Sequence, residues 1–212
     1  MNQILQTNLD THSNKKEKYS KKFKLIFIFS ILFFVLTVGF FSYRTIKINN
    51  NEKLSEKLNQ NYNTLKLYSQ KDPFNIPVGE AENELIGNIS ISKINLSYSF
   101  FSTLDNDSLK ISPCRFHGDL PPDYSNLCIA GHNYDNDKFF SNLSDLTIND
   151  EIYLEIQGKT YVYSVFNMYE VDETDLSPIY SYPDKIRQLT LVTCNNLNKK
   201  RLIVKAKCVN IL

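Results

Sequence analysis

From Leu85 to the end of the chain, hydrophobic and polar residues alternate in short runs, which is the pattern of β-strands. In residues 151–156 every second residue is Ile or Leu, so one face of that segment is expected to be buried. Residues 202–209 alternate in the same way. We expect eight strands, near residues 89–91, 94–98, 115–117, 127–131, 151–156, 160–171, 189–193 and 202–209.

Two short helices are expected between these strands, at residues 105–109 and 138–146. In the second segment Phe139, Phe140 and Leu143 recur at helical spacing. Many short strands with few long helices favour a closed or nearly closed barrel. The predicted fold class of this region is therefore mainly β.

Upstream of the strands, residues 25–43 form a run of nineteen residues without a charge. As a helix this run would span about 28 Å, close to the hydrocarbon thickness of a bilayer. A cleaved signal peptide and a buried core helix are the alternatives. No small-residue cleavage site follows the run, and it has no polar face, so we expect a single uncleaved transmembrane helix.

The charges on the two flanks of this helix predict its orientation. Six lysines lie within residues 15–24, whereas residues 44–58 hold four basic residues. The positive-inside rule then favours a cytoplasmic amino terminus and an extracellular carboxyl-terminal domain at the cell membrane. We expect a cytoplasmic basic tail at 1–24, of which residues 1–14 are mobile, the transmembrane helix at 25–43, a stalk at 44–84 and the main domain at 85–212.

The stalk carries one apolar helical stripe, with Leu54, Leu58 and Tyr62 four residues apart. A helix leaning on the domain is the interpretation we favour, and Pro73 ends it. The Asp-Pro-Phe triplet at 72–74 has two interpretations: an ordinary linker turn, or a plug that places an aromatic ring and a carboxylate over a groove.

Composition excludes several functions. The formal net charge is +1, without the basic patch that nucleic-acid binding requires, so no nucleic-acid partner is expected. The four cysteines, at 114, 128, 194 and 208, lack metal-ligand spacing, and we expect neither a metal nor another cofactor. A disulfide between Cys114 and Cys128 is conceivable outside the cytoplasm, but the sequence does not set connectivity.

Three residues at strand ends carry the candidate chemistry. Cys194 ends one apolar strand, Arg201 begins the next, and His132 follows a third. A thiol acts as a nucleophile in its thiolate form, which a nearby cation favours, and a histidine at a loop mouth can exchange protons with a substrate. Taken singly, each residue is more often structural: a buried thiol, a satisfied histidine or a solvated arginine.

In combination, these residues resemble the sortases, the membrane-anchored cysteine transpeptidases of Gram-positive bacteria. Residues 190–194 match the family motif T-L-x-T-C, and Arg201 leads into the following strand. Residues 129–132 resemble the end of the family's histidine strand, followed by an F-x-x-L turn at Phe139 and Leu143. The resemblance extends over residues 85–209 and is most similar to classes A and D, although residues 72–74 resemble the lid of class C.

The resemblance implies an eight-stranded sortase-type β-barrel and cleavage of an L-P-x-T-G-like sorting signal between Thr and Gly. Cys194 would form a thioester, His132 would move protons, Arg201 would hold the oxyanion or the signal peptide, and Thr193 would help to shape the substrate pocket. Lys200 is the alternative cation. Partners implied are surface or pilin proteins with a C-terminal sorting signal, with an amine of a cell-wall precursor or pilin as acceptor.

Two other functions fit the residues. The first is a non-catalytic, membrane-tethered β-domain that binds a surface partner, in which Cys194 would be inert. The second is an unrelated cysteine hydrolase that uses water alone. Some class A sortases bind calcium, but no calcium ligands can be assigned here, and Asp105, Asp107 and Asp123 are expected to be surface charges.

Overall fold

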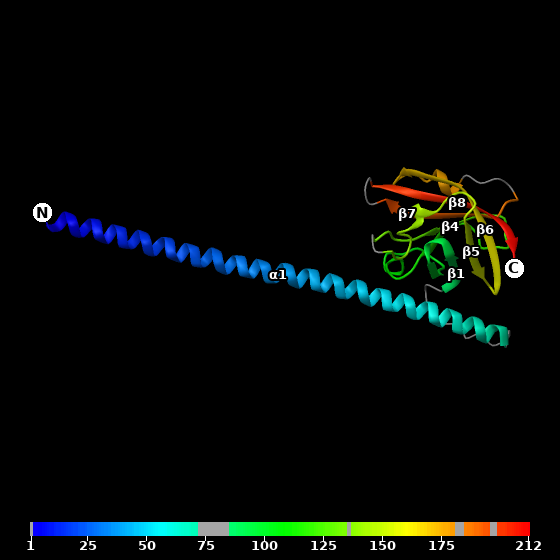
Figure 1. Cartoon of the computed structure of the whole chain (residues 1–212), viewed down its shortest axis with the longest axis horizontal. Coiled ribbons are helices and arrows are strands. Elements are labelled where there is room, and N and C mark those ends of the chain that lie inside the picture. The colour runs from blue at the N-terminus through cyan, green and yellow to red at the C-terminus, as the bar shows by residue number, and fades with distance from the viewer. Residues whose placement is uncertain (1, 72–84, 135–136, 181–184, 196–198) are drawn as a thin grey trace. The chain divides into compact units, whose positions relative to one another are not determined.

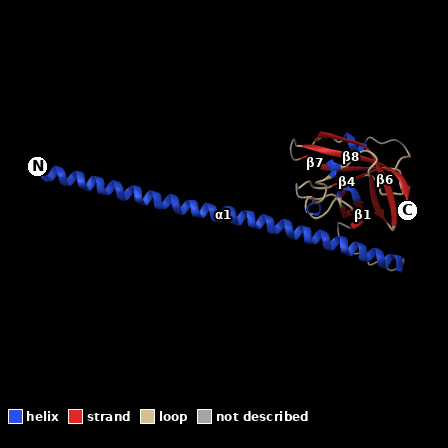
Figure 2. Cartoon of the chain, viewed as in Figure 1, coloured by secondary structure: helices blue, strands red, loops and turns tan. Residues whose placement is uncertain are grey.

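The computed structural model describes residues 2–71, 85–134, 137–180, 185–195 and 199–212. The chain divides into two units, Met1–Asn50 and Asn51–Leu212, and all strands belong to the second unit. Figure 1 labels the elements, and Figure 2 shows that strands dominate the carboxyl-terminal domain. The Asp-Pro-Phe triplet at 72–74 lies outside the described residues, so the lid hypothesis stays a prediction.

Helix α1 (Asn2–Lys71) contains the apolar segment. Among the described residues, one helical stretch, Lys22–Gln60, is long and apolar enough to cross a membrane, with a mean hydropathy of 2.6 in its best window. Residues 2–14, expected as a mobile tail, are the first turns of α1 instead. Neither Gly nor Pro occurs in that polar segment, so no strong helix breaker interrupts it.

Within the second unit, the stalk part of α1 contacts the barrel. Asn59 Nδ2 donates a hydrogen bond to Ser97 O at 3.1 Å, and its Oδ1 accepts one from Ser99 N. Glu52 forms an ion pair with Lys138, in the loop that follows His132. The Asn59 amide thus pairs with strand β2 (Leu96–Phe101) as a neighbouring strand would, and this contact supports the interpretation of a stalk leaning on the domain.

Eight strands close into a barrel in the order β1-β2-β3-β4-β7-β8-β6-β5, which confirms the predicted fold. All neighbours are antiparallel except β2–β3 and β4–β7. The strands are β1 (Leu85–Ile91), β2 (Leu96–Phe101), β3 (Cys114–His117), β4 (Asn126–Ala130), β5 (Glu151–Ile156), β6 (Lys159–Asp172), β7 (Gln188–Asn195) and β8 (Lys200–Ile211).

The short helices differ from the prediction. They are η1 (Ser92–Ile94), η2 (Ser108–Lys110), η3 (Leu143–Asp145) and α2 (Ser177–Tyr180). The segment 138–146, predicted as a helix, contains only η3, because Phe139 adopts a positive φ of 51°. Its apolar spacing instead buries Phe140 and Leu143 completely. Strand β2 begins two residues later than expected, since Ile94 belongs to η1 and Asn95 is left-handed.

The barrel interior is filled by the alternating apolar residues that the sequence pattern identified. Ile152, Leu154 and Ile156 are at most 1% exposed. On β4, β7 and β8 the interior residues are Leu127, Ile129, Leu189, Leu191, Val204 and Ala206. Since side chains alternate along a strand, the intervening residues of these three strands point to the outer face of the barrel. That outer face carries the candidate site.

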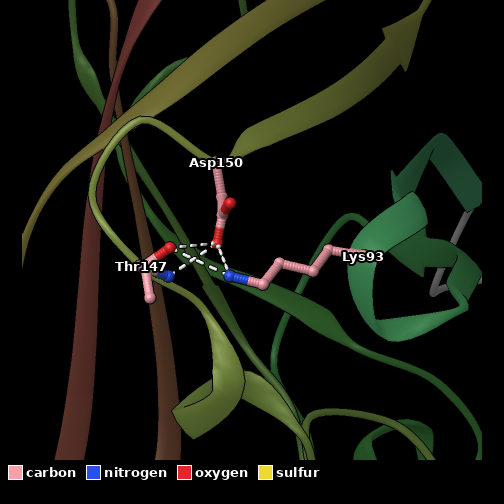
Figure 3. Close-up of polar contacts among 3 residues, drawn as sticks. All are labelled: Lys93, Thr147 and Asp150. Carbon is pink, nitrogen blue, oxygen red and sulfur yellow. Dashed lines mark hydrogen bonds and ion pairs between the residues drawn. The ribbon is translucent and has the colours of Figure 1, made fainter.

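One exposed cluster joins η1 to the turn before β5 (Figure 3). Lys93 Nζ lies 2.7 Å from Asp150 Oδ2 and donates to Thr147 Oγ1 at 2.9 Å. The hydrogen bond from Lys93 lowers the pKa of Asp150. Such a partly exposed ion pair contributes at most about 1 kcal/mol to the stability of the fold. We therefore interpret it as a contact that stabilises the turn before β5.

All four cysteines lie in the described part of the chain, and none forms a disulfide. Cys114 is opposite Ala130 in the β3–β4 ladder and Cys128 is opposite His117, so the two thiols do not face each other. Burial raises the pKa of both thiols to about 12. Cys114 and Cys128 are therefore protonated and unreactive at neutral pH.

Candidate active site

A cavity of about 320 Å³ brings together all four residues singled out from the sequence: His132, Thr193, Cys194 and Arg201. Its floor is the outer face of three adjacent strands, where Val192 of β7 lies between Ala130 of β4 and Ile203 of β8. Residues that were far apart in sequence thus meet because β4 and β7 run parallel and both end at this cavity.

Cys194 and Arg201 are directly opposite each other in the antiparallel β7–β8 ladder. Arg201 Nη1 donates a hydrogen bond to Cys194 Sγ. A positively charged guanidinium is therefore in direct contact with the sulfur of the candidate nucleophile. Lys200, the alternative cation, is opposite Asn195 and is exposed, so the geometry favours Arg201.

The ends of β7 and β4 are fastened to each other by side chains. Thr193 is 3% exposed, and its Oγ1 donates to Gly131 O at 2.8 Å. Asn133 Nδ2 donates to Cys194 O at 3.1 Å. Each bond joins a residue at the thiol end of β7 to a residue adjacent to His132. These two bonds hold the backbone on both sides of His132 at a fixed position relative to the backbone of Cys194.

Gly131, the residue directly before His132, lies close to an aromatic ring because it has no side chain. A Cβ at this position would lie 2.6 Å from Phe140 Cδ2, well inside contact distance. Phe140 is fully buried and its backbone N–H donates to His132 O at 2.9 Å. Any side chain at 131 would therefore press on the ring of Phe140, the residue whose backbone N–H bonds the His132 carbonyl.

The imidazole of His132 is partly buried and stacks on Tyr134, with ring centroids 4.6 Å apart. Burial, and then the positive charge of Lys110, lower the pKa of His132 below its ordinary value of 6.5. Both causes act against the charged form. The resting histidine is therefore predominantly neutral at pH 7.

Another part of the cavity lining comes from the segment between β6 and β7. Leu176, Pro178 and Ile179 supply apolar surface, while Glu173 and Asp175 add carboxylates. Asp175 Oδ1 accepts a hydrogen bond from Ser177 N at 2.8 Å, which caps α2 and lowers the pKa of this carboxyl. The cavity thus combines an apolar surface with a thiol, an imidazole and a guanidinium.

No set of three His, Cys, Asp or Glu residues in the described ranges is arranged to hold a metal ion. Asp105, expected as a surface charge, accepts hydrogen bonds from Asp107 N and Ser108 N, both at 2.9 Å. Asp105 is exposed, as expected, and these bonds close the turn that precedes η2.

Sequence reasoning missed the residues that support the site. Asn133 and Tyr134 belong to a polar stretch that looks like an ordinary loop, and Lys110 is distant in sequence. The wall around α2 was also missed, because residues 171–187 have little helical pattern. An asparagine directly after the histidine was the one available signal, since its short amide side chain reaches neighbouring backbone readily.

The Sortase domain family model matches residues 89–209, more than half of the chain. The chain belongs to the sortase family. Over 80 residues it is 31% identical to sortase A of Staphylococcus aureus, a match that covers 37% of this chain and 39% of that one. The aligned part is thus well under two thirds of the curated relative.

Solved sortases share the fold. A lid mutant of sortase A from Corynebacterium diphtheriae matches with a TM-score of 0.57 and 30% identity, over 62% of this chain and 73% of that chain. A sortase D5 transpeptidase from Clostridium perfringens matches with a TM-score of 0.58 and 26% identity, over 74% and 97%. A pilus-related sortase C of Group B Streptococcus is also similar, with a TM-score of 0.56 and 25% identity. Classes A, C and D are all represented among these sortases.

Proposed function

We propose that this sortase is a cysteine transpeptidase that cleaves an L-P-x-T-G-like sorting signal between Thr and Gly. The observation that carries the proposal is the single cavity lined by His132, Cys194 and Arg201, the residues that the family motifs indicate. A peptide carbonyl bound in this cavity would lie near a nucleophile (Cys194), a proton carrier (His132) and a hydrogen-bond donor for the oxyanion (Arg201). Membership of the sortase family supports the same chemistry.

In the first half-reaction, the sulfur of Cys194 attacks the carbonyl carbon of the substrate threonine. A C–S bond forms, the C–N bond to glycine breaks, and an acyl thioester remains on the enzyme. His132, neutral at rest, takes the thiol proton and then gives it to the departing amine. The lowered pKa of His132 makes its imidazolium a ready proton donor.

In the second half-reaction, the amine of a cell-wall precursor or of a pilin attacks the thioester. A new C–N bond forms, the C–S bond breaks, and His132 accepts the proton of the incoming amine. Cys194 is regenerated, and the surface protein or pilin is transferred without net hydrolysis.

Arg201 has two roles in this mechanism. Its contact with Cys194 Sγ keeps a positive charge beside the attacking sulfur. A guanidinium carries five N–H donors, so it can also hydrogen-bond the oxygen that becomes negative in the tetrahedral intermediate. Thr193 acts indirectly, since its hydroxyl fastens β7 to Gly131.

The proposed position of the protein in the cell membrane follows from helix α1. We infer that residues 25–43 span the cell membrane once, with the basic tail at 1–24 in the cytoplasm and the catalytic domain, residues 85–212, outside the cell. The excess of lysines before the apolar run supports this orientation. It would bring the cavity to the surface where sorting signals and cell-wall amines occur.

The test uses the full chain in detergent micelles with a panel of fluorogenic L-P-x-T-G-type peptides. Turnover should require Cys194, and added hydroxylamine or a glycine peptide should accelerate turnover and appear in the product. A Cys194→Ala protein that is as active as the wild type would exclude the proposed cysteine transpeptidase mechanism. Turnover without amine incorporation would instead indicate a cysteine hydrolase that uses water, and a Cys208→Ala variant is the matched control.

A further inference from the structure

The cavity wall at α2 rests on a row of polar residues that the proposed mechanism does not use. Asn126, Thr190 and Lys205 come from β4, β7 and β8, which lie side by side (Figure 1). They are 0%, 0% and 5% exposed. Asparagine, threonine and lysine are rarely buried this deeply unless their polar groups are paired, so the row requires an explanation.

The register places this row on the outer face, beneath α2. Thr190 is opposite Lys205 in the β7–β8 ladder, and Asn126 lies on β4, two residues before the partner of Thr190. Thr190 precedes Cys194 by four residues on the same face of β7, which is about 13 Å along a strand. The polar row and the thiol therefore share the outer face of these strands, and the row itself lies outside the cavity lining.

Donors from the row converge on two backbone carbonyls of α2. Asn126 Nδ2 donates to Pro178 O at 3.1 Å and to Ile179 O at 3.0 Å. Lys205 Nζ donates to Pro178 O at 2.7 Å. The carbonyls at the end of a one-turn helix have no hydrogen-bond donors within the helix. The side chains of Asn126 and Lys205 provide the missing donors.

The carbonyls of Pro178 and Ile179 fix which way the Asn126 amide points, and Thr190 provides a donor for the amide oxygen. Its Oγ1 lies 2.6 Å from Asn126 Oδ1 and donates to it. The opposite orientation would direct the amide oxygen at two carbonyl oxygens, where no hydrogen bond is possible. The first threonine of the T-L-x-T-C motif thus satisfies the oxygen of the Asn126 amide, whose nitrogen holds α2.

We propose that Asn126 and Lys205 are positioning residues for the sorting signal: they hold Pro178 and Ile179, which line the cavity that Cys194 also lines. This inference rests on the proposed function, because the wall matters only if a peptide binds there. Neither residue touches the reacting atoms. Loss of either one should weaken peptide binding while leaving the chemistry at the thiol intact.

The test compares Lys205→Met with the wild type in the full-length protein. Methionine keeps the length and removes the donor, and replacing a buried charge with an apolar side chain is often tolerated. The KM for the fluorogenic peptide should rise about tenfold, as expected for one lost hydrogen bond from a charged donor, with kcat changed less than about threefold. Alkylation of Cys194 by iodoacetamide should proceed at the wild-type rate.

Two further variants complete the design. Lys207→Met, on the same strand but exposed, should behave as the wild type. Thr190→Val should raise KM in the same direction as Lys205→Met, and it provides a second assessment should the lysine variant not fold.

Hydrogen exchange of the segment 173–180 gives a readout that needs no turnover. Exchange should be faster in Lys205→Met and Thr190→Val than in Lys207→Met. A wild type without turnover on any peptide would contradict the proposed function, whereas faster exchange would still support the fastening of α2. Unchanged exchange, or faster exchange with an unchanged KM, would overturn the assignment of Lys205 and Asn126 as positioning residues.

Discussion

Arg201 lies directly across the β7–β8 ladder from Cys194 and donates a hydrogen bond to its sulfur. The pairing comes from backbone register, because the antiparallel alignment of β7 and β8 places position 201 opposite position 194. The position of the guanidinium beside the thiol is therefore set by the pairing of two adjacent strands. Register at this one pair determines whether the thiol has a charged partner.

The first prediction concerns this pair. Arg201→Met should lower kcat by about 100- to 1000-fold, as expected when an oxyanion donor is removed, and should slow iodoacetamide alkylation of Cys194. Lys200→Met is the matched control and should retain activity. The opposite ranking, with Lys200 essential and Arg201 dispensable, would show that the neighbouring lysine is the functional cation.

The second prediction concerns the titration of His132. Its imidazole should titrate below pH 6.5 because of burial and of the charge on Lys110. Lys110→Met should raise this midpoint by removing the repulsive charge, whereas Lys138→Met, in the loop after His132, serves as a charge control. NMR of the imidazole protons measures both. A His132 midpoint at or above 6.5 in the wild type would contradict the neutral resting state.

The third prediction links that pKa to stability. Between the lowered pKa of folded His132 and 6.5, the unfolded chain binds more protons than the folded chain. The contribution of His132 to stability is therefore complete above pH 6.5 and is lost as the pH falls toward the folded-state pKa. Thermal unfolding of wild type and His132→Gln at pH 8 and pH 5 tests this: the wild type should lose more stability than the variant. An equal loss in both proteins would show that His132 does not contribute.

How far the sequence predicts this molecule depends on whether the determining contacts are local. Alternation identified Ile152, Leu154 and Ile156 as interior residues, and strand ends followed by polar residues identified His132 and Cys194. These signals lie within single segments. Lys205 could not be recognised in the same way: it alternates with Ala206 like any outward-facing polar residue, and it is buried only because α2 packs over it.

The segment 138–146 illustrates a different limit. Its apolar spacing favours a helix, but the same spacing also suits a loop that folds back on the barrel. The left-handed backbone at Phe139 and the contact between Gly131 and Phe140 decide the outcome.

The fourth prediction tests that contact. Gly131→Ala places a methyl group against the buried ring of Phe140, and overpacking of this kind costs about 1–3 kcal/mol. Activity should fall as well, because the residue adjoins His132. Adding Phe140→Leu, which removes ring atoms near position 131, should restore part of the melting temperature. A single variant as stable and active as the wild type would show that the close approach is not required.

The most direct test of the account is intact mass spectrometry of the full-length protein after brief incubation with an L-P-x-T-G-type peptide. The account predicts a mass increase equal to the acyl fragment ending in threonine, located on Cys194, absent from Cys194→Ala, and lost when hydroxylamine or a glycine peptide is added. Cleavage of the peptide by the Cys194→Ala protein, or an acyl group located on any other residue, would contradict it.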